Sequence, residues 1–130
     1  MKYHFPAVAT ILFASLSLTT AAAAARVEAL SEAAKIERLL THVRDMKDAE
    51  FIRNGKAYDG KAAAEHIQKK YENAKDQVKT ARDFIAKCAS KSEASGDAYK
   101  IRFKDGKEQT ASEYLTAQLD QIEKAAKSHA

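Results

Sequence analysis

Hydrophobic and polar positions between residues 28 and 47 follow one another with the spacing of a helix. Apolar side chains return every three or four residues, and Arg, Glu and Lys fill many positions between them; the apolar set is Leu30, Ile36, Leu39, Leu40, Val43 and Met46. This pattern is typical of an amphipathic helix. We therefore predict a helix from about Glu28 to Lys47, whose apolar face is covered by the rest of the fold.

A second apolar stripe continues from residue 63 to residue 88 with no Gly or Pro to interrupt it. Its members are Ala63, Ile67, Tyr71, Ala74, Val78, Ala81, Ile85 and Cys88. Asp59 is placed to cap a helix that begins near Lys61. The pair Thr80 and Asp83 has the spacing of a capping box, which favours a new helix start. We predict two helices joined near residues 74–80; one kinked helix over residues 61–89 is the alternative.

Three shorter segments have the pattern of strands and turns. Asn54-Gly55 separates Phe51–Arg53 from Lys56–Tyr58, and this dipeptide favours a type I′ hairpin because both residues must take positive φ. Residues 99–103 alternate apolar and basic side chains, and Glu108-Gln109 can return as an edge strand.

A last helix follows a Thr110–Glu113 capping box, with core positions Tyr114, Leu115, Leu119, Ile122 and Ala126. The elements together predict a single α+β domain over residues 26–130. It is mainly helical, with about four helices and a small antiparallel sheet in which residues 99–103 can pair with the hairpin.

The first 25 residues have a different pattern. Lys2 precedes an uncharged apolar run from Phe5 to Leu18, and alanines follow up to Ala25. This order is typical of a cleavable signal peptide, and the run of about 14 residues is shorter than the roughly 20 that span a bilayer. We expect residues 1–25 to be removed and the mature chain to be periplasmic, with no stable membrane anchor. An uncleaved anchor is the alternative.

Charge and cysteine content narrow the function further. Removal of Lys2 lowers the formal net charge from +4 to +3, a small excess in a chain with 31% charged residues. Such a balance is typical of a solvated surface, so we expect no nucleic-acid partner. Cys88 is the only cysteine, which excludes an internal disulfide. Its place on the apolar stripe favours a small buried side chain, and an intermolecular disulfide is the alternative.

The segments FIRNGKAY, AAAEHIQKK and KTARDFIAKCASKSEASGDAYKIRFKDG carry a resemblance to a known family. The chain resembles small exported bacterial proteins that are grouped as a domain of unknown function, over about Phe51 to Gly106 and more weakly into the last helix. The resemblance implies an exported scaffold of the bacterial envelope. It implies no particular chemistry.

The hairpin and the helix after it contain the first group of candidate site residues: Arg53, Asn54, Tyr58 and His66. Arg53 can hold an anionic group through two hydrogen bonds, with Tyr58 and His66 as further donors. The structural alternative is that Asn54 only shapes the turn while Tyr58 and His66 pack against the core.

The loop before Tyr99 contains the second group: Ser90, Ser92 and Ser95, with Tyr99 at its end. These hydroxyls can bind an anion or a carbohydrate, or one of them can act as a nucleophile. Serines are also common in loops because they hydrogen-bond the local backbone. No Gly-x-Ser-x-Gly or Ser-x-x-Lys motif accompanies them, which argues against a hydrolase.

Two other features carry less weight. His42, His66 and His129 lack the short spacing of metal ligands, so we expect no metal and no cofactor. Lys100, Arg102 and Lys104 form a basic strand face, which can contact anionic polymers or simply keep an edge strand in solution.

We therefore expect a periplasmic binding or interaction module that is not an enzyme. Its recognition surface combines the hairpin with the serine loop, since these irregular segments hold the unusual polar residues. A small envelope hydrolase that uses a loop serine and a structural homodimer formed through apolar helix faces are the alternatives. The ligand or protein partner cannot be named from the sequence.

Overall fold

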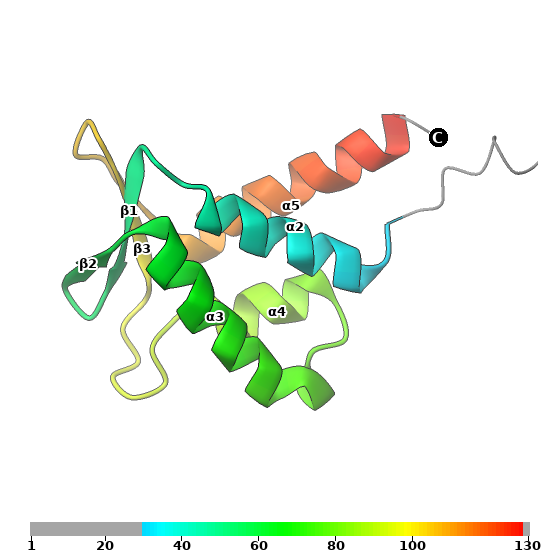
Figure 1. Ribbon diagram of the computed structural model, residues 1–130, viewed down its shortest axis with the longest axis horizontal. Coiled ribbons are helices and arrows are strands. Elements are labelled where there is room, and N and C mark those ends of the chain that lie inside the picture. Colours follow the sequence, from blue (N-terminus) through cyan, green and yellow to red (C-terminus); the bar gives the residue numbers. More distant parts are fainter. Residues whose placement is uncertain (1–29, 129–130) are drawn as a thin grey trace, which may run out of the picture.

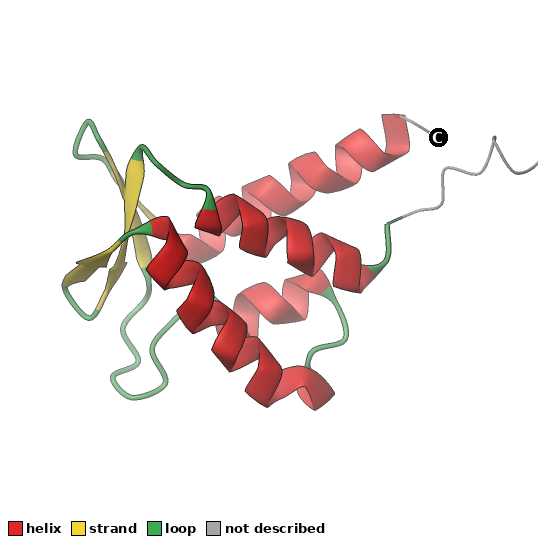
Figure 2. Ribbon diagram, viewed as in Figure 1, coloured by secondary structure: helices red, strands yellow, loops and turns green. Residues whose placement is uncertain are grey.

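The computed structural model describes residues 30–128, in which four α-helices lie on one side of a four-stranded antiparallel sheet (Figures 1 and 2). The elements in chain order are α2 (Glu32–Arg44), β1 (Ala49–Arg53), β2 (Lys56–Tyr58), α3 (Gly60–Ala74), the 3₁₀ turn η1 (Lys75–Gln77), α4 (Ala81–Cys88), β3 (Lys100–Phe103), β4 (Glu108–Thr110) and α5 (Ala111–Ser128). The predicted α+β class is confirmed. The expected signal peptide, residues 1–25, lies outside the described residues.

Helix α2 is shorter than the pattern predicted. The Ser31 hydroxyl accepts a hydrogen bond from the Ala34 N–H and so caps the helix, which ends at Arg44. Residues 45–47 are not helical, although Met46 still packs against the core. The prediction of a helix to Lys47 was wrong because Met46 keeps its apolar contact from a turn, in which its N–H binds the Val43 carbonyl.

The predicted hairpin is confirmed. Asn54 and Gly55 take φ values of 51° and 77°, as a type I′ turn requires. Phe51 pairs with Tyr58 and Arg53 with Lys56 across the two strands. Strand β3 pairs with the other side of β1, and β4 with β3, so the strand order is β2-β1-β3-β4. The pairing of the segment at 99–103 with the hairpin is thereby confirmed.

The long apolar stripe forms two helices, as predicted. Helix α3 starts after its Asp59 cap and ends at Ala74. Thr80 then begins α4 with a complete capping box, in which the Thr80 hydroxyl accepts from the Asp83 N–H and the Asp83 carboxylate accepts from the Thr80 N–H. Two caps so close together end one helix and start the next even though the apolar stripe continues.

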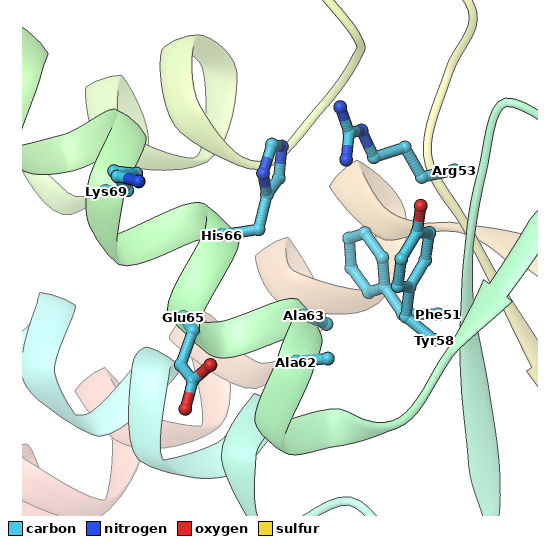
Figure 3. A pocket seen from close by; sticks show the side chains of 8 residues that line it. All are labelled: Phe51, Arg53, Tyr58, Ala62, Ala63, Glu65, His66 and Lys69. Atoms are coloured by element: carbon cyan, nitrogen blue, oxygen red, sulfur yellow. The ribbon is translucent and has the colours of Figure 1, made fainter.

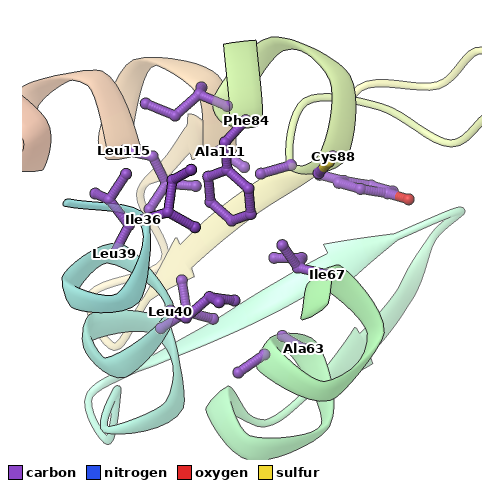
Figure 4. Packing of buried hydrophobic residues seen from close by; sticks show 14 of the residues in the cluster. Ile36, Leu39, Leu40, Ala63, Ile67, Phe84, Cys88, Ala111 and Leu115 are labelled. Atoms are coloured by element: carbon purple, nitrogen blue, oxygen red, sulfur yellow. The ribbon is translucent and has the colours of Figure 1, made fainter. Parts of the chain in front are cut away.

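The core lies between the sheet and the helices (Figure 4). Each helix contributes its apolar stripe, the sheet contributes Phe51 and Ile101, and Tyr99 lies directly before β3; the buried helical side chains include Ile36, Leu39, Leu40, Ile67, Phe84, Cys88, Leu115 and Leu119. Cys88 is fully buried and free, as expected for a small packed side chain. Burial raises the pKa of its thiol, so the reactive thiolate form is disfavoured.

The basic strand face is largely paired with carboxylates. Arg102 binds Glu108 at 2.9 Å, Lys104 lies 3.2 Å from Asp48, and Lys107 lies 3.9 Å from Asp105. Antiparallel register also sets Glu50 opposite Arg102. The outer face of β3 is therefore a mixed-charge surface, which weakens its case as a binding site for anionic polymers. Within residues 30–128, no helix combines the length and apolar character needed to cross a membrane.

Candidate ligand-binding site

One pocket lies between the hairpin and the first turns of α3 (Figure 3). Side chains two apart on a strand share a face, so β1 turns Phe51 and Arg53 toward the same side. Tyr58 lies directly opposite Phe51 on β2. Residues at i, i+3, i+4 and i+7 share a helix face, which brings Ala62, Glu65, His66 and Lys69 together. These residues and Ala63 line a pocket of about 270 Å³.

Three of the four residues in the first predicted group line this pocket: Arg53, Tyr58 and His66. The fourth, Asn54, is in the turn beside it and faces the serine loop. The register of the hairpin and the spacing along α3 therefore bring these three side chains together. The order of the residues in the sequence suggested this cluster but did not establish it.

Arg53 is the most unusual of the pocket residues. Its Nε atom is buried and has no hydrogen-bond partner among the described residues. Its guanidinium carbon lies 6.0 Å from the centre of the Tyr58 ring, a cation–π contact that positions the group without satisfying its N–H donors. A buried donor without a partner costs about 1–3 kcal/mol. Arg53 therefore brings a guanidinium with an unsatisfied buried N–H to the pocket wall.

His66 is joined to the core through Tyr99. The His66 Nε2 atom lies 3.2 Å from the Tyr99 hydroxyl, and the Lys70 ammonium donates to the same hydroxyl at 3.3 Å. An ammonium can only donate, and Tyr99 is 1% exposed, so the Tyr99 hydrogen is directed to His66 Nε2. This network assigns the hydrogen of a neutral His66 ring to Nδ1, where it is a donor.

Burial lowers the pKa of His66 below its usual value of 6.5, and the positive charges of Arg53, Lys70 and Lys69 lower it further. His66 is therefore neutral near pH 7. The cations that line the pocket at this pH are Arg53 and Lys69, and Glu65 is the one carboxylate among the lining residues described.

The serine loop lies against the hairpin turn through Asn54. The Ser95 hydroxyl donates to the Asn54 side-chain oxygen at 2.6 Å, and the Asn54 amide nitrogen donates to the Ser92 hydroxyl at 3.4 Å. The two irregular segments expected to form one surface are thus adjacent. Ser92 is 3% exposed and Tyr99 1% exposed, however, so these two residues support the surface from below.

The loop hydroxyls have structural partners. Ser90 donates to the Ile85 carbonyl at 2.6 Å, at the end of α4, and Ser92 and Ser95 are bound to Asn54. A nucleophilic serine needs a base within hydrogen-bond reach. Among the hydrogen bonds of residues 30–128, no histidine or carboxylate side chain contacts these three hydroxyls, which argues against the hydrolase alternative.

Sequence reasoning did not assign Phe51, Glu65, Lys69 or the two alanines to the site. A signal was present for Ala62, Ala63 and Lys69, because each stands three or four positions from His66 on a helix. Lys70 was also missed; it binds the Lys91 carbonyl at 2.9 Å as well as Tyr99. Residues 30–128 contain no group of three or more His, Cys, Asp or Glu side chains arranged to hold a metal ion.

The fold and the pocket define a small α+β domain with one amphipathic site between a hairpin and a helix. The chain belongs to a family of unknown function, DUF5329, whose model matches residues 30–123. It is 38% identical over 82 residues to the uncharacterized protein YfeK of Salmonella typhimurium (strain LT2), which covers 63% of this chain and 68% of that protein. No solved structure matches the chain. The resemblance to a domain of unknown function is confirmed; periplasmic location stays a prediction.

Proposed function

We propose that this protein is a periplasmic binding module of the bacterial envelope and that its ligand enters the pocket between the hairpin and α3. The observation that carries the proposal is Arg53, whose buried Nε has no partner among the described residues although it lines a pocket. Native folds satisfy nearly all buried donors, so an exception in a pocket wall favours a binding role for the Arg53 side chain. The N-terminal pattern of a signal peptide supports the location.

The surroundings of Arg53 support binding over a purely structural role. Tyr58 positions the guanidinium, and Phe51 and Ala63 supply an apolar wall. Ligand sites commonly combine an apolar lining with a few placed polar groups. The Asn54 contacts with Ser92 and Ser95 fix the turn from the other side, so the pocket is preorganised before a ligand arrives.

A thermal-shift screen tests this function. The mature protein, isolated after export, is heated with peptidoglycan fragments, lipopolysaccharide, anionic lipid vesicles or divalent metal ions. A ligand at 100 times its Kd adds about 2.7 kcal/mol, which raises the Tm of a domain this size by roughly 10 °C or more. We expect one class of component to produce such a shift.

The control uses two variants that each remove one positive charge near the pocket. Arg53→Ala should abolish the shift, whereas Lys61→Ala, an exposed residue outside the pocket lining, should retain it. Arg53→Ala must keep the circular dichroism of the folded protein. A screen with no shift, or a shift that survives Arg53→Ala unchanged, contradicts the proposal.

A further inference from the structure

The pocket is polarised along its length. On β1 the lining changes from Phe51 to Arg53, and on α3 it changes from Ala62 and Ala63 to His66 and Lys69. The step from Phe51 to Arg53 covers two strand residues, about 7 Å. The step from Ala62 to His66 covers four helix residues, about 6 Å. Both walls therefore change from apolar to cationic over similar distances. Figure 3 draws Ala62 and Ala63 near the start of α3 and His66 one turn further along. A ligand that matches this lining has one apolar end and one anionic end.

The charge of the lining limits the charge of the ligand. Arg53 and Lys69 supply two positive charges and Glu65 supplies one negative charge, so the lining is +1 when His66 is neutral. One negative charge on the ligand neutralises this excess. A phosphate monoester carries about −1.5 to −2 at pH 7, which exceeds the +1 of the lining residues. A carboxylate carries a single charge, and its two oxygens match the paired donors of a guanidinium.

The polar end also has the donors that a carboxylate requires. Arg53 lines the pocket and offers the paired terminal nitrogens of its guanidinium, whereas its Nε is buried. His66 offers the Nδ1 hydrogen, because Tyr99 occupies Nε2. A neutral histidine that donates one hydrogen bond suits an acceptor-only group such as a carboxylate.

We propose that this pocket binds a monocarboxylate with a short apolar group, held by Arg53 and His66 at the carboxylate and by Phe51, Tyr58 and Ala63 at the apolar end. The proposal rests on the proposed function and adds the chemical class of the ligand. The volume of about 270 Å³ falls slightly below the range of roughly 300–1,000 Å³ for drug-sized molecules. The ligand is therefore a small acid or the carboxylate end of a peptide.

The test is an NMR titration of the isotope-labelled, exported protein with four probes. Butyrate, butanamide and propyl phosphate have similar apolar groups and differ in the polar end, and N-acetyl-alanyl-alanine presents a peptide carboxylate. We expect butyrate or the peptide to shift the amide resonances of residues 51–66. Its Kd should be at least tenfold lower than that of butanamide, which corresponds to about 1.4 kcal/mol. The carboxylate that binds more tightly identifies the source of the ligand.

Variants separate the pocket from general charge attraction. Arg53→Gln should raise the Kd of the carboxylate probe at least tenfold, and Arg53→Lys should also weaken it because an ammonium lacks the paired geometry. Lys61→Gln removes an equal charge from an exposed position outside the pocket lining and should change the Kd less than twofold. The two Arg53 variants provide independent tests if one of them does not fold.

Each other result overturns the carboxylate proposal in a distinguishable way. Tighter binding of propyl phosphate, or equal binding of butanamide, rejects the ligand class but leaves a functional pocket. If an envelope component shifts the resonances of residues 51–66 and none of the four probes does, the ligand class is likewise rejected and a functional pocket remains. If neither the probes at their solubility limits nor any envelope component shifts these resonances, both the ligand class and the proposed function are wrong.

Discussion

Asn54 is the residue that joins the hairpin to the serine loop. Its backbone accepts a φ of 51° that few side chains tolerate, while its amide exchanges hydrogen bonds with Ser92 and Ser95. The type I′ turn needs the first property, and the contact between the segments needs the second. One residue therefore sets the shape of the turn and places it against the loop.

Asn54→Gly separates these two roles, because glycine adopts the same φ but has no side-chain amide. We expect the free energy of unfolding to fall by about 1 kcal/mol, which is within the usual net range for a hydrogen bond. Hydrogen exchange at residues 92–97 should become faster. Urea denaturation and exchange by NMR measure the two effects. A double-mutant cycle with Ser95→Ala should give a coupling energy of at least about 0.5 kcal/mol; additive losses would contradict the bridge.

His66 should make stability depend on pH. Its folded pKa is lowered by burial and then by Arg53, Lys70 and Lys69, whereas the unfolded value is 6.5. As the pH falls below 6.5, the unfolded chain binds a proton before the folded chain does, so the free energy of unfolding decreases until the folded pKa is passed. Denaturation curves between pH 7 and pH 5 should show this loss, and His66→Gln should reduce it.

A second variant checks the cause of the lowered pKa. Lys69→Gln removes one of the positive charges that disfavour the protonated ring, so an NMR titration should find the His66 pKa closer to 6.5 than in the parent protein. An unchanged or lower pKa would show that the charge of Lys69 does not act on His66.

At the scale of elements, helix boundaries are set by caps and by close contacts between helices. The α3 and α4 helices belong to one apolar stripe but are separated by η1 and the Thr80 cap. Gly60, the first residue of α3, lies against the carbonyl groups at the end of α2. A β-carbon at Gly60 would meet the Val43 carbonyl oxygen closely and would lie 3.0 Å from the carbonyl oxygens of Arg44 and Met46.

Thr80→Ala should destabilise the fold by about 1 kcal/mol, because the first turn of α4 loses its hydroxyl cap. The Tm should fall by roughly 4–8 °C for a domain of this size. Calorimetry measures the change. Thr41→Ala, on an exposed position inside α2, is the matched control and should change the Tm little. Equal effects of the two substitutions would mean that the capping box contributes nothing.

Gly60→Ala tests which of two opposite effects is larger. Helix propensity alone predicts a gain of about 1 kcal/mol for alanine. The contacts with backbone carbonyls predict a loss of about 1–3 kcal/mol, since the α2 backbone must move to admit a methyl group. We expect a net loss by urea denaturation, with Lys61→Ala within about 0.5 kcal/mol of the parent protein as the control. A stabilised Gly60→Ala protein would contradict this packing.

At the scale of the whole molecule, the helix faces that suggested a homodimer are covered within one chain. Ile36, Leu40 and Leu119 are each 2% exposed or less. These three apolar side chains are thus packed in the core of one chain, and a homodimer stays a prediction. Polar residues of the hairpin and α3 remain accessible around the pocket, so the surface that we propose for recognition borders the core at Phe51 and Ala63.

The predicted export also concerns the whole molecule. We predict that expression of the full chain in a bacterium delivers a protein that starts at Arg26, within two residues, to the periplasmic fraction, because the apolar run is followed by small residues suited to cleavage. Intact mass measurement of the osmotic-shock extract determines the first residue. A full-length mass in the membrane fraction would support the uncleaved anchor instead.

The sequence by itself determined the elements of this fold, because each one depends on local chemistry. The Asn54-Gly55 turn, the Asp59 and Thr80 caps and the periodic apolar stripes act within a few residues, so the hairpin, the helix starts and the α+β class could be predicted. The exceptions were both ends of α2. The helix begins at Glu32 after its Ser31 cap instead of near Glu28, and Met46 stays in the apolar pattern after the helix has ended.

Only the tertiary structure decided which of the candidate residues share a site. Arg53 and His66 meet because strand register and the direction of α3 bring them to one pocket, and the same packing buries Ser92 and Tyr99 beneath the surface. Within residues 30–128 it also left Arg53 Nε without a partner, a property that no local pattern contains. Contacts between distant segments depend on the packing of the whole core, which is why the site required the structure.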